Sequence, residues 1–229
     1  MKQGNIYYKG KTTEAGEALL LDYAAGALNE ALSLVVSTHL SMSSSSRAFV
    51  KQCETIGGHL LVSECEPISV SSTCFETVMA KLEQECRDHY SPCKSLNTNS
   101  FQGIDIPSPL SEVLNPIQHD RCLWHKMLKG MEFLDVLRCD QSLARLFRMA
   151  PATAVPSHSH TGLEVTLILD GAFSDETGEY FMGDLIVEDE TTTHTPVSCP
   201  RQGCVCLAVT TSPVRLTGWV GRFINPFLR

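Results

Sequence analysis

The sequence predicts two domains in tandem, a small helical bundle followed by an antiparallel β-barrel or sandwich. Apolar residues recur at helical spacing over residues 16–90. From about residue 120, short apolar runs alternate with turn signals, which is typical of strands in a sandwich or barrel. The stretch between them is polar and carries three prolines, so we expect a linker over residues 91–109. The expected domains are therefore residues 1–90 and residues 110–229.

Net charge, the length of apolar runs and the cysteine pattern restrict the functions and locations that the chain can have. The 229 residues carry 18 Lys and Arg against 26 Asp and Glu, a formal net charge of −8, and neither half is basic. This charge argues against direct binding of nucleic acid, which normally needs a basic patch. No apolar run approaches the roughly 18 residues of a membrane-spanning helix, and the first residues contain no apolar secretion segment. Ten cysteines without a C-x-x-C pair then indicate reduced thiols, so we expect a cytoplasmic protein that binds neither membranes nor nucleic acid.

The first three helices are predicted from apolar periodicity and from capping residues. Residues 19–28 and residues 32–40 each repeat apolar side chains every three or four positions. Asn29 precedes the second segment as an N-cap, because its side chain can accept a hydrogen bond from a free backbone N–H of the first turn. The serines at residues 43–46 then break the pattern and can cap a third helix. Two glycines at residues 57–58 weaken that helix by about 1 kcal/mol each relative to alanine.

A fourth amphipathic segment follows a turn-rich stretch around Pro67. Over residues 75–86 its apolar side chains share one face and its charged side chains share the other. The apolar stripes of the first, second and fourth helices can form either the core of a closed bundle or a groove that clamps the helices of a partner.

The clearest chemical signal lies in the β-rich half. His158 and His160 are two residues apart, so both rings point to one face of a strand. Glu164 keeps that parity if the strand continues, although Thr161–Gly162 can interrupt it. Gly171 is expected to end the strand with a turn. His194 lies on the strand that follows a second, Gly-Asp turn. In a small barrel these four side chains can converge, and three imidazoles with one carboxylate are a good ligand set for a divalent first-row metal.

Two cysteines are a second feature of this half. Cys204 and Cys206 alternate on a strand and share one face, which lines the barrel near the metal if it points inward. Oxidation to sulfenic acid would then be possible, whereas a direct disulfide is disfavoured by a Cα separation of roughly 6.5–7 Å. The alternative is that both are small apolar core residues. The acidic residues 188–190 are predicted to be a solvated turn, so the sequence indicates no additional general acid or base.

Two parts of the sequence together resemble a known family. Residues 158–194 resemble the cupin motifs, H-x-H-x3-E-x6-G followed by a Gly-Asp turn and a histidine. Residues 19–40 look like the N-terminal helices of the ChrR anti-sigma factors. Trp124 and the strand containing Gly-Cys-Val-Cys match the cupin-like half of that family. The resemblance covers most of residues 19–215.

The resemblance implies a fold, a metal and a partner. The fold is a jelly-roll cupin barrel behind the helical domain, and the partner is an extracytoplasmic-function sigma factor held by apolar helix faces. One divalent metal would occupy the barrel, with zinc as the first choice and iron, manganese and nickel accepting the same donors. The cupin metal ligands carry over to His158, His160, Glu164 and His194.

The chain departs from the family at the zinc motif of the helical domain. The family binds zinc there through an upstream histidine and H-x3-C-x2-C, whereas this sequence has His39, Ser43 and Ser46 and no histidine near residues 13–14. A serine hydroxyl stays protonated at neutral pH, so one imidazole cannot form a closed four-ligand site. We therefore expect no N-terminal zinc, His39 as a core or surface histidine, and Ser43 and Ser46 as helix caps.

These features favour a regulator over an enzyme. In an anti-sigma protein the helical domain binds the sigma factor, and the metal-bound cupin domain senses a signal, oxidative if Cys204 and Cys206 take part. One alternative is a metal-dependent cupin dioxygenase, which uses the same ligand set but needs a general base and has no use for the helices. Another is a small-molecule-binding cupin whose helical domain only forms a homodimer.

Overall fold

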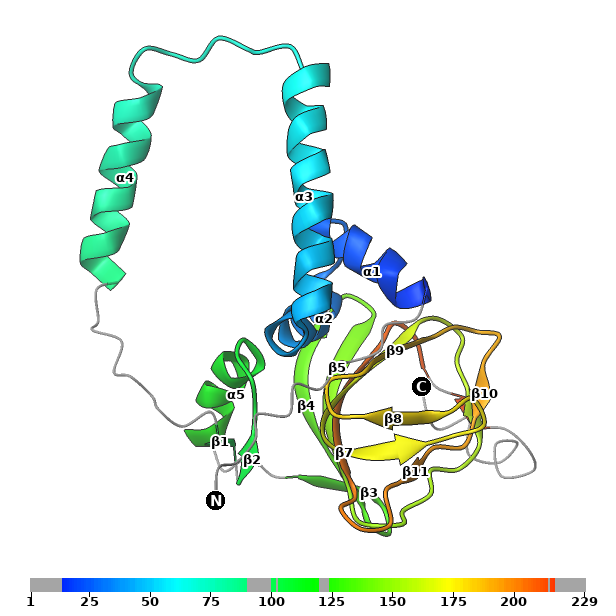
Figure 1. The fold of residues 1–229 in the computed structure, drawn as a ribbon. Helices are drawn as coiled ribbons and strands as arrows, with labels where there is room; N and C mark the ends of the chain where they lie inside the picture. Colours follow the sequence, from blue (N-terminus) through cyan, green and yellow to red (C-terminus); the bar gives the residue numbers. More distant parts are fainter. Residues whose placement is uncertain (1–13, 90–99, 102, 120–123, 214, 217–229) are drawn as a thin grey trace, which may run out of the picture.

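A computed structural model describes residues 14–89, 100–101, 103–119, 124–213 and 215–216 (Figure 1). Four helices come first: α1 (Glu14–Ala24), α2 (Glu30–Met42), α3 (Ser44–Glu64) and α4 (Cys74–His89). The remainder is β-rich, with β1 (Ser100–Phe101), β2 (Ile104–Asp105), α5 (Leu110–His119), β3 (His125–Leu128), β4 (Met131–Cys139), β5 (Ser142–Met149), β6 (His158–Ser159), β7 (Glu164–Ser174), β8 (Glu179–Phe181), β9 (Leu185–Glu188), β10 (Thr193–His194), β11 (Val197–Ser198), β12 (Cys204–Thr210) and β13 (Arg215–Leu216). The predicted order of helices followed by antiparallel strands is confirmed.

The strands form a barrel-like body from two principal sheets. The larger sheet has the order β11-β7-β12-β5-β4-β3, with β8 and β9 also paired to β7. The smaller sheet has the order β10-β6-β13, and every one of these pairings is antiparallel. His158 of β6 and His194 of β10 lie on this smaller sheet, and His160 directly follows β6.

The central strands of the larger sheet are buried on both faces. Along β12, Cys204 and Cys206 belong to an inner apolar cluster with Ile168 of β7. The alternate residues Val205 and Leu207 belong to a second cluster, which extends into α1 and α2. Helix α2 packs across β4, β5, β7 and β12, so it covers the outer face of the sheet while the inner face looks into the barrel. This double burial explains the unbroken apolar sequence of β12.

The N-caps predicted at Asn29 and Ser43 are confirmed, whereas Ser46, also expected as a cap, lies within the first turn of α3. The Asn29 side chain accepts a hydrogen bond from the Leu32 N–H at 3.0 Å, and its amide donates to Ser142 Oγ of β5 at 2.8 Å. Ser43 caps α3 by accepting from the Ser46 N–H. Each cap is therefore part of the interior of the molecule as well as the start of a helix.

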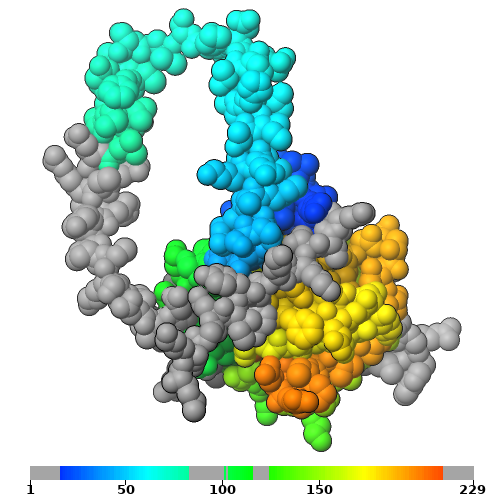
Figure 2. Space-filling view, viewed as in Figure 1, coloured from blue at the N-terminus to red at the C-terminus, as the bar shows by residue number. Residues whose placement is uncertain are grey.

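Of the two arrangements expected for the helices, the closed four-helix bundle is not formed by the described residues. Helices α1, α2 and α3 pack together at the barrel, but the outer part of α3 and all of α4 project from the body and stand apart (Figures 1 and 2). Apolar side chains on both are exposed, including Val62 at 83% and Phe75 at 72%. Among the described residues no helix is long and apolar enough to cross a membrane. The apolar stripe of α4 therefore contributes to no core within the described structure.

The predicted linker is wrong over residues 100–101 and 103–106. Strands β1 and β2 pair there as a small antiparallel hairpin, and Phe101 and Ile106 are buried in the core that includes α2 and α5. The polar and proline-rich composition hid this apolar pattern. Residues 90–99, with the domain ends at residues 1–13 and 217–229, lie outside the described residues.

The turn expected at Gly171 is also wrong, because β7 continues through it to Ser174. Gly171 has φ of +71°, and a Cβ there would lie 2.3 Å from the carbonyl oxygen of Gly203. The pairing register with β12 shifts between Val205 and Cys206, just before this point. The glycine therefore allows β7 to bend within one strand and reach β8 and β11.

Candidate metal centre

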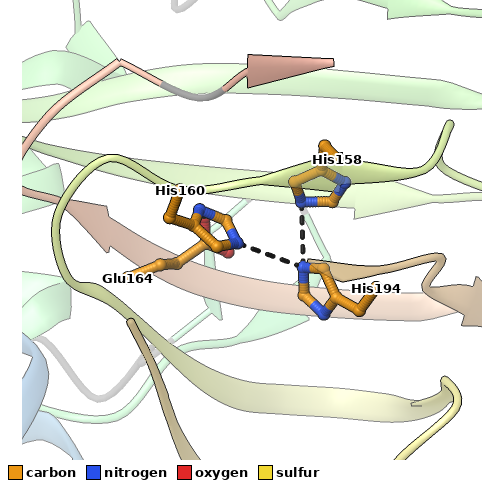
Figure 3. A group of neighbouring side chains, drawn as sticks. All are labelled: His158, His160, Glu164 and His194. Carbon is orange, nitrogen blue, oxygen red and sulfur yellow. Dashed lines mark hydrogen bonds and ion pairs between the residues drawn. The ribbon is translucent and has the colours of Figure 1, made fainter. Parts of the chain in front are cut away.

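Four side chains from three neighbouring backbone segments meet inside the barrel (Figure 3). His158 lies on β6 directly opposite His194 of β10, because the two residues are register partners. His160 follows β6, and the chain turns before β7 begins at Glu164. The strand is therefore interrupted between His160 and Glu164, as the sequence allowed at Thr161–Gly162, and the Glu164 carboxylate lies beside the His160 ring.

The ring nitrogens are spaced as metal ligands would be. His194 Nε2 lies 2.9 Å from His158 Nε2 and 3.3 Å from His160 Nε2. Metal–nitrogen bonds of about 2.0–2.1 Å at ligand angles of about 90–109° place two donor atoms roughly 2.9–3.4 Å apart. The donor atoms of all four residues lie within 4.8 Å of one another. These four residues therefore fit one divalent cation.

Hydrogen bonds on the other side of two of the rings fix their orientation. His158 Nδ1 lies 2.9 Å from the carbonyl oxygen of Pro156, which can only accept, so this nitrogen carries the proton. His194 Nδ1 lies 2.7 Å from a Glu188 carboxylate oxygen. The Nε2 lone pairs of these two rings are thereby left facing the His160 ring, an arrangement that a shared cation satisfies. His160 Nδ1 lies 3.2 Å from Glu164, which is itself a candidate ligand, so this contact gives the His160 ring no separate outer partner.

Burial sets the protonation of the site. It lowers the pKa of His158, and together with the neighbouring His158 and His194 rings it lowers the pKa of His160 to about 4. Burial and the Glu188 charge raise the pKa of Glu164 to about 7. Burial lowers the pKa of His194, but the hydrogen bond and charge of Glu188, the hydrogen bond with Asp175 and the charge of Glu164 together outweigh burial and raise this pKa. His158 and His160 are consequently neutral near pH 7, which is the form that binds metals.

The prediction for Glu188 is wrong, while Asp189 and Glu190 are exposed as expected. Glu188 is 6% exposed and is the register partner of Glu164 across β7 and β9. It also shares His194 Nδ1 with Asp175, whose carboxylate oxygen lies 3.2 Å away. The alternation of β9 would have indicated this inward position, because Glu188 is two residues beyond the buried Ile186.

Cys204 and Cys206 lie on the inner face of β12, with Ile168 and Phe173. Both thiols are buried. A hydrogen bond with Cys204 and burial raise the pKa of the Cys206 thiol, and the Glu164 charge adds to the shift. Cys206 is therefore a protonated thiol near the metal ligands rather than a reactive thiolate.

Comparison with known proteins identifies the family. Residues 115–214 match a family model described as the ChrR cupin-like domain. The anti-sigma-E factor ChrR of Cereibacter sphaeroides is 35% identical over 213 residues, which cover 93% of this chain and 96% of that protein. The chain belongs to the ChrR family of anti-sigma factors.

A solved ChrR-family structure shares the arrangement of both halves. The crystal structure of Rhodobacter sphaeroides SigE in complex with the anti-sigma ChrR contains a chain that matches this one with a TM-score of 0.69 and 32% identity. The match covers 89% of this chain and 98% of that chain. The cupin-like fold and the preceding helices are thus both features of the family.

The ChrR-type zinc motif is gathered in space but does not fit a metal. His39 of α2 is fully buried, and its Nε2 lies 2.8 Å from the Ser46 hydroxyl. The Ser43 hydroxyl lies 2.9 Å from that of Ser46. Two neutral hydroxyls beside one imidazole lack the thiolate charge that a structural zinc site requires. His39 is consequently a core histidine, one of the two roles predicted for it.

Proposed function

We propose that this chain is an anti-sigma factor that binds an extracytoplasmic-function sigma factor through its helical half and receives a signal through its cupin half. The observation that carries this proposal is the end-to-end similarity, at 32% identity, to a chain crystallised together with SigE. Similarity restricted to the barrel would support only a cupin.

The projecting helices provide a suitable binding surface. On α4 the exposed apolar residues recur at positions i, i+3, i+4 and i+7; they are Phe75, Val78, Met79 and Leu82. The outer half of α3 exposes Ile56, Leu60, Leu61 and Val62. Open space separates the two helices in Figure 2. Exposed apolar surface of this extent marks an interaction site, and two such helices can grip a helical partner from both sides.

The cupin half would hold the metal through His158, His160, Glu164 and His194. When bound, the cation would supply a Lewis acid centre. We propose zinc, and the donor set also accepts iron, manganese and nickel. The protein residues orient the imidazoles and exclude bulk water. A signal at this centre can release the sigma factor only if it favours one state of the barrel–helix contact over another.

Glu188 does not supply the free general base that the dioxygenase alternative needs. Its carboxylate is engaged by His194 Nδ1, so it orients a ligand instead of serving as a free base.

Co-expression with a sigma factor encoded beside this gene tests the proposal. We expect the two chains to copurify and transcription from the sigma-dependent promoter to fall. Met79→Asp should weaken this complex at least about tenfold, because an unpaired charge would enter an apolar interface. Met127→Asp on β3 is the matched control, since Met127 is 43% exposed and Met79 is 41% exposed.

A stable homodimer with no affinity for the sigma factor would contradict the proposal and favour the small-molecule-binding alternative. Equal complex formation by Met79→Asp and Met127→Asp would remove α4 from the proposed binding surface.

A further inference from the structure

The ChrR-type zinc position in this chain contains a continuous hydrogen-bonded chain of side chains. His39 comes from the C-terminal end of α2, and Ser43 and Ser46 come from the junction where α2 ends and α3 begins. All three are buried. At the positions where the resemblance implies a histidine and two cysteines, this chain brings an imidazole and two hydroxyls together.

The direction of each hydrogen bond follows from its end points. His39 Nδ1 lies 3.1 Å from the carbonyl oxygen of Gly183, which can only accept, so Nδ1 carries the proton. In the neutral ring Nε2 is then an acceptor, and the Ser46 hydroxyl donates to it at 2.8 Å. The Ser43 hydroxyl donates to Ser46 Oγ, and Ser43 Oγ accepts from the Ser46 N–H. Within the Ser43–Ser46–His39 set, each ring nitrogen and each hydroxyl has a hydrogen-bond partner.

The surroundings of His39 resemble those of a zinc-binding histidine. Zinc-binding histidines commonly donate one ring N–H to a backbone carbonyl and direct the other nitrogen at the metal. His39 does the first with Gly183, and the Ser46 hydroxyl lies where the second nitrogen would meet the cation. The N-cap of Ser43 then fixes the start of α3, which a metal would otherwise fix.

We propose that the Ser43–Ser46–His39 chain replaces the zinc of the helical domain and latches that domain to the barrel. Gly183 belongs to the turn between β8 and β9, so the His39 bond crosses from the helices to the cupin half. The latch therefore needs no metal and no cysteine, and neither a chelator nor a thiol oxidant can open it.

Strand β9 connects the Ser43–Ser46–His39 set to the candidate metal centre. Strand β9 begins two residues after Gly183 and ends at Glu188, which holds His194. One short strand thus joins the hydrogen bond of His39 to the outer hydrogen bond of a metal ligand. The junction of α2 and α3 contacts the turn that precedes β9, and the candidate metal centre contacts the end of β9.

Metal content and chelation of the full-length chain test the absence of zinc. We expect a His158→Ala/His160→Ala double variant to contain no bound metal and to keep the same melting temperature with and without EDTA. A metal equivalent that persists in this variant and disappears on adding His39→Ala would overturn the proposal. An EDTA-induced fall in its melting temperature would do the same.

Ser46→Ala tests the hydrogen-bond chain itself. It removes the donor to buried His39 Nε2, and we expect the melting temperature of the full chain to fall by about 3–6 °C. Ser44→Ala is the matched control, because Ser44 is exposed in the same turn of α3. Equal melting temperatures for the two variants would contradict the latch.

A nitrogen-15 NMR measurement keeps the test decisive if Ser46→Ala fails to fold. In the wild-type chain we expect His39 to be neutral with its proton on Nδ1, giving one protonated and one unprotonated ring nitrogen. A proton on Nε2, or a ring protonated on both nitrogens at pH 7, would overturn the assignment. None of these measurements uses a sigma factor, so they can fail while the anti-sigma function stands.

Discussion

At the scale of single residues, the metal centre depends on groups that do not face the cation. Pro156 and Glu188 each engage the outer nitrogen of a histidine and leave its inner nitrogen free. Without such partners an imidazole can flip or change tautomer, and the three Nε2 atoms would no longer converge. The residues that orient the ligands therefore determine metal affinity together with the ligands themselves.

Glu188→Gln tests this directly. The amide keeps the size of the side chain but removes the charge that stabilises the His194 ring, so the Kd for the metal should rise by about 10–100-fold. Competition with a chromophoric chelator measures it. Glu190→Gln is the control, because Glu190 is exposed just beyond β9. A Kd for Glu188→Gln within twofold of this control would show that Glu188 does not orient His194.

At the scale of elements, the bend in β7 is what allows one strand to serve several neighbours. The strand pairs with β9 and β12 before Gly171 and with β8 and β11 after it. Glu164 begins this strand, while Asp175 follows its end and reaches His194. The bend thus brings both ends of β7 to the same metal centre.

Gly171→Ala should be strongly destabilising. Its positive φ and the close approach of the Gly203 carbonyl leave no room for a methyl group, so we expect a loss of at least about 2 kcal/mol in unfolding free energy and about 4–8 °C in melting temperature. Thermal denaturation of the full chain measures it.

Gly178→Ala is the control, because Gly178 has open space around a Cβ. If Gly171→Ala and Gly178→Ala have the same melting temperature, the backbone at Gly171 is not constrained as described.

At the scale of the whole molecule, the two halves share one core. Helix α2 lies between α1 and α3 on one side and the large sheet on the other, with Val35 and Val36 fully buried in the same cluster as Leu207. Asn29 and His39 add hydrogen bonds across the same contact. A change in the barrel can therefore reach the projecting helices through α2.

The parts of this structure that follow local rules could be predicted from the sequence. The caps at Asn29 and Ser43 depend on residues within one turn, and the grouping of His158, His160 and Glu164 depends on spacing within one segment. Such patterns are visible without knowing which strands pair.

The parts of the structure that depend on contacts with distant residues could not be predicted from the sequence. Phe101 is buried because a neighbouring core accepts it, although the sequence around it is polar and rich in proline. The projection of α4 is likewise invisible to periodicity, because an apolar stripe looks the same whether its partner lies within the chain or in another protein.

X-ray absorption at the edge of the bound metal, recorded on the purified full-length chain, tests the metal centre most directly. The account predicts one metal per chain with nitrogen and oxygen ligands at about 2.0–2.2 Å, imidazole scattering, and complete loss in the His158→Ala/His160→Ala variant. Sulfur ligands at about 2.3 Å, or metal retained by that variant, would contradict it.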